Sequence, residues 1–170
     1  RHTAYLTANI LMITRLDTCT FSLKTEPIHV DEQIRLALAL NEAKWVAKNI
    51  TMLVVLDEFT MDGNDTLLAQ VWMNLIDNAI KFSPENGCIS VALKKLGSKH
   101  CSVSIHNAGQ PISKETLSHI FEKFFRADVS RTTDGNGLGL SIVQKVLQLH
   151  SGTIKVESDK ESGTIFEVFL

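Results

Sequence analysis

The sequence predicts an α+β fold: a two-layer sandwich in which helices gather on one face of a mixed, largely antiparallel sheet, preceded by one further helix. Three observations predict it. The chain has 170 residues, 44% hydrophobic and 21% charged, which suits one packed domain with an appendage. Segments with helical apolar spacing are interspersed with β-branched and aliphatic runs. These elements follow in the order helix, strand, helix, strands, helix and hairpin.

Composition and charge exclude several classes of protein. The net charge is −2, without a basic surplus, so no nucleic-acid partner is expected. Cys19, Cys88 and Cys101 form no CxxC pair, which argues against a zinc site or a disulfide framework and favours buried thiols in a reducing cytosol. The longest aliphatic run, residues 52–56, is far shorter than the roughly 18 residues of a membrane span. A soluble, cytoplasmic fragment is therefore expected.

The first element is a helix in residues 1–18. Its apolar side chains share one side of the helix: Leu6, Ile10, Ile13 and Leu16. This stripe is expected to pack against a helix outside the sequence or in a second chain, and the alternative is docking on the main domain. The main domain occupies residues 19–170.

A second helix begins at Asp31, and a strand follows it. The helix is expected to turn three side chains inward, with Trp45 beside them: Ile34, Leu38 and Val46. Residues 50–56 are β-branched and aliphatic, which predicts a strand.

A long helix is predicted over residues 66–82. Residues 62–65 form a turn before it, in which Asn64 or Asp65 caps the helix. Residues 83–87 contain proline and glycine and end it.

The remaining elements are strands over 88–96 and 100–105, a short helix over 114–121, a longer helix over 138–150 and a hairpin of residues 153–158 and 164–170. The mostly irregular stretch 107–137 has a length that is typical of a functional lid or of a disordered segment.

The long helix carries a polar face. Asn74 and Asn78 are four residues apart and share one side, with Lys81 close to it. Two amide oxygens beside an ammonium suit a magnesium–phosphate group, because Mg²⁺ prefers hard oxygen ligands and lysine binds phosphate. The alternative is a solvated polar stripe.

An Asn-x-Gly turn follows the strand that ends near Ile105. Asn107 can donate and accept hydrogen bonds, and Gly109 lets the backbone approach a planar ligand. The alternative is a plain surface turn.

Alternating glycines open the helix over 138–150. Gly135, Gly137 and Gly139 surround its start, where free N–H groups can bind an anion. The spacing differs from the dinucleotide-binding G-x-G-x-x-G, and no strand runs into the loop. The alternative is a glycine-rich turn without a ligand.

Phe124 and Phe125 anchor a segment that carries Arg126. A guanidinium there could stabilise phosphoryl oxygens. The alternative is a surface arginine beside an aromatic pair of the core.

In this combination and order, the segments resemble the catalytic ATP-binding domain of a bacterial sensor histidine kinase, in the wider GHKL group of ATPases with the Bergerat fold. The resemblance covers about residues 21–170. The similar motifs are the N box (74–83), the first glycine box (107–109), the F box (121–126), the second glycine box (135–140) and the final Gly-Thr element (162–164).

The resemblance implies ATP and Mg²⁺ as cofactors. Asn78 would be the Mg²⁺ ligand, Lys81 would contact phosphate and Phe82 would flank the adenine. Asn74 stands where hydrolysing relatives such as gyrase carry a general-base glutamate, and an amide there suits a kinase that does not waste ATP on water.

At the adenine, the resemblance implies that Asn107 receives the amino group, that Thr164 assists through water, and that Gly109 and Ile112 belong to the same site. The family usually has aspartate at position 107. Asparagine loses a charge-assisted hydrogen bond, so weaker ATP binding than is usual for the family is predicted. Pro111 stands where the family often has a second glycine, which would stiffen the hinge of the lid.

At the phosphates, the resemblance implies a cradle of backbone N–H groups from Gly137, Leu138 and Gly139. Arg126 would approach the γ-phosphate from a lid over about residues 113–134. Lys81 and Arg126 are the candidate catalytic residues.

The resemblance also implies partners. Family members carry a phosphoacceptor histidine, followed by an acidic residue, on the first helix of a dimerising hairpin. This sequence has no such box, and residues 1–18 resemble the second hairpin helix. The domain would transfer the γ-phosphoryl group to a histidine on a missing helix, in the same or a partner subunit, for relay to a response regulator. The parent would be a membrane-anchored homodimer, and this fragment would not phosphorylate itself.

Two other functions stay open. One is a GHKL serine kinase acting on a partner protein, although the helix that ends near Asp17 argues against it. The other is a non-catalytic nucleotide-sensing module, which the departures at Asn107 and Pro111 suggest.

Overall fold

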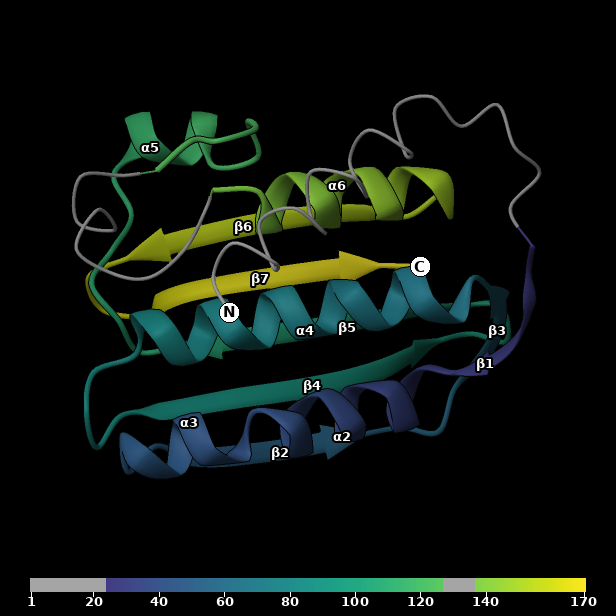
Figure 1. The fold of residues 1–170 in the computed structure, drawn as a ribbon, viewed down its shortest axis with the longest axis horizontal. Helices are drawn as coiled ribbons and strands as arrows, with labels where there is room; N and C mark the ends of the chain where they lie inside the picture. The colour runs from purple at the N-terminus through teal and green to yellow at the C-terminus, as the bar shows by residue number, and fades with distance from the viewer. Residues whose placement is uncertain (1–23, 127–136) are drawn as a thin grey trace.

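A computed structural model describes residues 24–126 and 137–170 (Figure 1). The helix expected in residues 1–18 lies outside these residues. The helices are α2 (Val30–Leu40), α3 (Glu42–Ala47), α4 (Asp65–Phe82), α5 (Lys114–His119) and α6 (Gly139–Leu149). The strands are β1 (Glu26–His29), β2 (Thr51–Leu56), β3 (Thr60–Gly63), β4 (Cys88–Leu96), β5 (His100–Asn107), β6 (Thr153–Asp159) and β7 (Gly163–Phe169).

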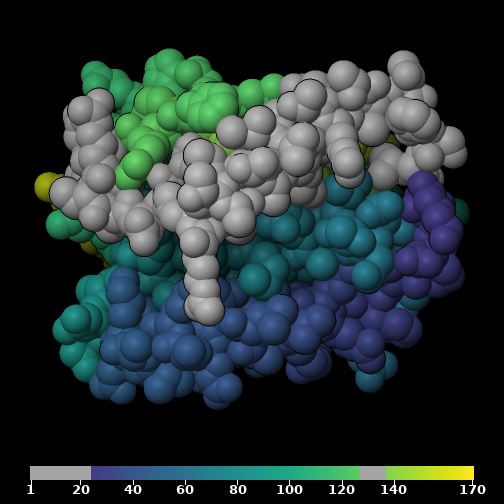
Figure 2. Space-filling view, viewed as in Figure 1, coloured from purple at the N-terminus to yellow at the C-terminus, as the bar shows by residue number. Residues whose placement is uncertain are grey.

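The strands form two sheets. Five lie in the order β2-β4-β5-β7-β6, with β2 and β4 parallel and the other neighbours antiparallel, while β1 and β3 form a separate antiparallel pair. In Figure 1, α2, α4 and α6 lie side by side on one face of the larger sheet. Figure 2 shows α2 and α3, in purple and blue, at the lower edge of this layer, with α4 in teal above them. The predicted two-layer sandwich is confirmed.

The core lies between the helical layer and the sheet. Alternate residues of β4 are buried against the helices, as expected for a strand with one covered face: Ile89, Val91 and Leu93. The largest buried side chain is Trp72 of α4, whose indole N–H donates to the Gln33 side chain of α2 across 3.0 Å. Burial of each large aliphatic side chain stabilises the fold by about 1.5–3 kcal/mol.

Helix α4 positions much of the site, and its beginning was predicted correctly. The side chain of Asn64 accepts from the Leu67 backbone N–H at 3.1 Å, and Asp65 adds a carboxylate to the first turn. Both features stabilise the positive end of the helix.

The expected single helix from Asp31 is two helices, because the chain breaks at Asn41. The amide of Asn41 donates to the Ala37 backbone oxygen at 2.9 Å and so ends α2. The break changes which side of the following turn faces the core. The expectation that Val46 faces inward is therefore wrong: its side chain is 55% exposed.

The turn predicted at residues 62–65 is shorter than expected, because Asp62 and Gly63 belong to β3. Their partners in β1 are Pro27 and Glu26, so a contact distant in sequence extends this segment.

The short helix expected over 114–121 ends at His119, and the helix expected from Leu138 begins at Gly139. Such shifts of one or two residues are common at helix ends.

Candidate functional site

One hydrogen bond joins the polar face of α4 to the start of α6. The amide Nδ2 of Asn74 donates to the Gly139 backbone oxygen at 3.3 Å, and its Oδ1 accepts from Gln70 Nε2 at 3.2 Å. Asn74 is only 6% exposed. Both ends of its amide are therefore engaged within the protein, and the glycine loop is fixed beside α4.

Asn78 lies one turn further along α4 and is half-buried. No hydrogen bond joins its side chain to another residue within 24–126 and 137–170. Its amide oxygen fits Mg²⁺, a hard cation that keeps several waters and shares phosphate oxygens. The described residues contain no group of three or more His, Cys, Asp or Glu that could hold a metal, so a cage built from such side chains is absent there.

Lys81 and Phe82 form the end of α4. The Lys81 ammonium lies 5.1 Å from the centroid of the Phe82 ring. Phe82 is 41% exposed, which is unusual for a phenylalanine and leaves part of its ring accessible to a ligand. The two side chains thus offer a cation and an apolar surface together.

The end of β5 brings the candidate adenine residues together. Asn107 is 3% exposed and is the strand partner of Thr164 on β7. The hydroxyls of Thr164 and Ser158 lie 2.7 Å apart, and Ser158 Oγ accepts from the Ile112 N–H at 2.9 Å. This chain of bonds holds Asn107, Thr164 and Ile112 in one region.

Gly109 allows this region to touch the end of α4. A Cβ built on Gly109 would lie 2.4 Å from the Phe82 backbone oxygen. Gly163, with a positive φ of +77°, similarly lies against Asn107, whose backbone oxygen would be 2.4 Å from an added Cβ. Side chains at these positions would push the motifs apart.

The second glycine box contacts the F box. Phe124 N–H donates to the Gly137 oxygen at 3.0 Å, and a Cβ on Gly137 would lie 2.7 Å from the Phe125 oxygen. Gly137 and Phe124 both have positive φ, +69° and 64°. Leu138 is fully buried, and its side chain belongs to the hydrophobic core.

The first turn of α6 offers N–H groups without helical partners, and it contains no acidic residue. An anion fits such a helix end. Arg126, half-buried, is the last residue of the F box. Gly135 and residues 127–134 of the expected lid lie outside the described part of the chain.

Sequence reasoning missed two supporting residues. Gln70 and Ser158 hold Asn74 and Thr164 in place. Their signal is weak in the sequence, because a glutamine in a helix and a serine in a strand are common. Both bonds are local: Gln70 lies one turn before Asn74 in α4, and Ser158 is the strand partner of Thr164 in the β6–β7 hairpin.

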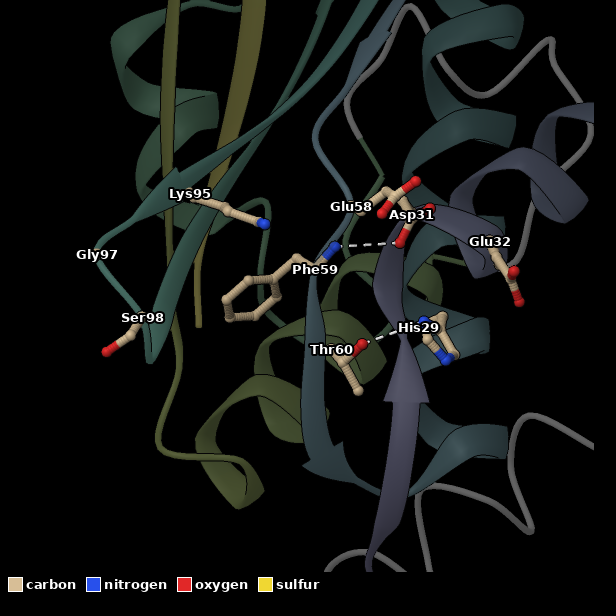
Figure 3. A pocket seen from close by; sticks show the side chains of 9 residues that line it. All are labelled: His29, Asp31, Glu32, Glu58, Phe59, Thr60, Lys95, Gly97 and Ser98. Carbon is tan, nitrogen blue, oxygen red and sulfur yellow. Dashed lines mark hydrogen bonds between the residues drawn. The ribbon is translucent and has the colours of Figure 1, made fainter.

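The pocket in Figure 3 is separate from these residues. It lies beside β1, β3 and the β4–β5 turn, and its lining includes His29, Asp31, Phe59 and Lys95. Asp31 accepts from the Phe59 N–H at 3.2 Å, so this carboxylate already has a partner. None of the site residues predicted from the sequence lines it.

Across residues 24–126 and 137–170, none of the helices combines the length and apolar character that crossing a membrane requires.

Comparisons with known proteins agree with this geometry. The family described as histidine kinase-, DNA gyrase B- and HSP90-like ATPases matches residues 63–170. The chain is 33% identical over 164 residues to the heme sensor protein HssS of Staphylococcus saprophyticus, an alignment that covers 96% of this chain and 35% of that protein. The chain thus spans about a third of the length of this curated relative.

Two solved structures are also similar. The catalytic domain of the histidine kinase ThkA has a TM-score of 0.77 and 30% identity, covering 87% of this chain and 97% of that one. ThkA in complex with the response regulator protein TrrA has a TM-score of 0.75 and 28% identity, covering 99% of this chain and 48% of that one.

Proposed function

This chain belongs to the family of histidine kinase-, DNA gyrase B- and HSP90-like ATPases, as a catalytic ATP-binding domain of the sensor histidine kinase type, and on this premise we propose how its residues bind ATP and where the γ-phosphoryl group goes.

The observation that carries the proposal is the bond between Asn74 and Gly139. It brings the start of α6 beside the α4 face that holds Asn78. The phosphates of ATP lie between α4 and the start of α6, on the backbone of Gly137, Leu138 and Gly139. Asn74 is a structural amide and not a base, which agrees with a domain that does not activate water.

Asn78 holds Mg²⁺ through its amide oxygen. When bound, this ion neutralises charge on the phosphate oxygens during transfer. Lys81 contacts a phosphate from the same helix, and Arg126 approaches the γ-phosphate. These residues position the phosphoryl group and offset its charge, which is most of what phosphoryl transfer requires of a protein.

The adenine lies near the carboxyl end of β5. Asn107 accepts a hydrogen bond from the amino group, and Thr164 assists through water. Gly109 and Ile112 line this end of the site, and Phe82 flanks the ring. The burial of Asn107 and its pairing with Thr164 support this placement.

The phosphoryl group passes to a histidine on a helix hairpin outside this sequence, in the same or a partner subunit, and then to a response regulator. The parent protein is a homodimer anchored in a membrane, with this domain in the cytoplasm. The likeness to ThkA, which was solved with a response regulator, supports the relay. Neither the serine-kinase nor the nucleotide-sensing alternative is favoured.

The test supplies the missing hairpin. The chain is incubated with radiolabelled ATP, Mg²⁺ and a separately expressed phosphoacceptor hairpin of a sensor histidine kinase relative. We expect acid-labile, base-stable phosphohistidine on the hairpin and none in its absence. A hairpin without its histidine is the control. Phosphoserine, or no transfer to several such hairpins, would contradict the proposed reaction.

A further inference from the structure

The end of α4 is held by the lysine that directly follows helix α3. Lys48, the residue that ends α3, donates from Nζ to the backbone oxygens of Ile80, Lys81 and Ser83, each at 2.9 Å. Lys48 is half-buried, so these bonds are partly protected from water. No sequence motif singled out this residue.

These bonds satisfy carbonyls that the helix cannot satisfy itself. The last four backbone oxygens of an α-helix have no partner within it. The oxygen of Ala79 accepts from the Ser83 N–H at 3.0 Å. The oxygen of Ile80 would normally accept from residue 84, but this is Pro84, which has no N–H. The Lys48 ammonium takes that place and adds a positive charge at the negative end of the helix.

The backbone of Lys48 holds the other side of the same turn. Its carbonyl accepts from the Asn86 N–H at 2.9 Å, and Asn49 Nδ2 donates to Asn86 Oδ1 at 2.7 Å. The turn from α4 to β4 is therefore fixed to the end of α3 at both of its ends.

The residues fixed in this way belong to the proposed ATP site. Lys81 and Phe82 lie in the turn that Lys48 holds, and Phe82 touches Gly109 of the first glycine box. We propose that Lys48 is a positioning residue: it holds the last turn of α4 so that Lys81 and Phe82 meet bound ATP. This inference rests on the roles proposed for Lys81 and Phe82.

The chain offers a matched control for the experiment. Lys44 lies one turn earlier in α3 and also reaches α4, but it pairs with the side chain of Asp77 in an exposed ion pair. Both lysines carry one positive charge from α3 to α4, and only Lys48 bonds to the backbone of the last turn. Exposed ion pairs contribute little to stability.

The experiment compares Lys48→Met and Lys44→Met in the full 170-residue chain, with ATP and Mg²⁺ binding followed by calorimetry and folding by circular dichroism. Lys48→Met is expected to raise the Kd for ATP by about tenfold, the size of one hydrogen bond to a charged group. Lys44→Met is expected to change the Kd by less than about twofold. Equal Kd values for Lys48→Met and the unchanged chain would overturn the proposal.

A double-mutant cycle separates positioning from plain stabilisation. If Lys48 acts through Lys81, then Lys48→Met has much less effect on the Kd in a chain that already carries Lys81→Met. Additive effects would overturn the part of the proposal in which Lys48 acts through Lys81. If Lys81→Met alone leaves the Kd unchanged, the proposed role of Lys81 fails instead. Should Lys48→Met not fold, Lys48→Arg is tested in its place. It is expected to raise the Kd for ATP in the same way but by a smaller factor, because a planar guanidinium fits three converging oxygens poorly.

Discussion

The side-chain amide of Asn74 donates to the backbone oxygen of Gly139 at 3.3 Å, across 65 residues of sequence. It joins α4 and α6 at the point where the proposed phosphate site lies. Because the receiving group is a carbonyl, the residue at position 74 must be a donor. An acidic residue of the same shape, such as aspartate, cannot make this bond.

Asn74→Asp should therefore destabilise the fold more than Asn74→Ala. Aspartate would bring a buried negative charge against a carbonyl oxygen, while alanine loses the bonds to Gly139 and Gln70 without adding a charge. We expect a loss of about 3 kcal/mol in the free energy of unfolding for aspartate and about 1 kcal/mol for alanine. Urea unfolding measures both. The opposite order would contradict the donor role of Asn74.

Asn78→Ala should abolish Mg²⁺-dependent ATP binding with little effect on stability, because the described residues leave its side chain without a partner. Calorimetry with and without Mg²⁺ measures the difference. Asn78→Asp is the matched control: it keeps a hard oxygen ligand at the same place and should retain Mg²⁺ dependence. Tight Mg²⁺-dependent binding by the alanine variant would remove Asn78 from the metal site.

Gly109→Ala and Gly139→Ala should differ sharply. The methyl group would lie 2.4 Å from the Phe82 backbone oxygen in the first case and no closer than 3.5 Å to Asn74 in the second. Because two backbone segments must move apart at Gly109, we expect about 2 kcal/mol of lost stability there and weaker ATP binding. Gly139→Ala should stay within about 0.5 kcal/mol. Thermal unfolding and ATP titration of both variants test this contrast.

Local patterns predicted much of the fold. The long helix expected over residues 66–82 and its Asn64 cap are both present in the structure as α4, and the strand expected over residues 88–96 is present as β4. The strands β1 and β3 escaped prediction because they have four residues each and are extended by pairing with one another. Val46 was placed wrongly because the pattern does not reveal the break at Asn41.

The candidate site also contains some residues that could be predicted from the sequence and others that could not. The motif residues could be found from the sequence because each has distinctive chemistry at a distinctive spacing. Their supports could not, since Lys48 acts through an ammonium on backbone oxygens more than 30 residues away, and one lysine among many gives no such signal. The resemblance named candidate residues for ATP binding, while the structure adds residues that hold these candidates in place.

Cys101 should be unreactive in the folded chain. Burial raises the pKa of its thiol from 9.0 to about 11, so the nucleophilic thiolate is scarce at neutral pH. The neutral thiol is favoured in the fold, so its contribution to stability is complete below pH 9.0 and is lost as the pH rises through about 11. Alkylation followed by peptide mapping should find Cys101 labelled only after unfolding. Labelling in the native chain as fast as in urea would contradict its burial.

Asn107→Asp should bind ATP more tightly and fold less stably. A carboxylate accepts the adenine amino group through a charge-assisted bond, which lowers the expected Kd by about tenfold. The same charge must be buried, since Asn107 is 3% exposed, and without ATP this costs about 1–3 kcal/mol. Calorimetry and urea unfolding measure the two effects, with Asn107→Ala as a control that should weaken binding. If the aspartate variant kept the Kd of the unchanged chain, Asn107 would not be the adenine acceptor, because a charge at that atom must alter the bond that it accepts.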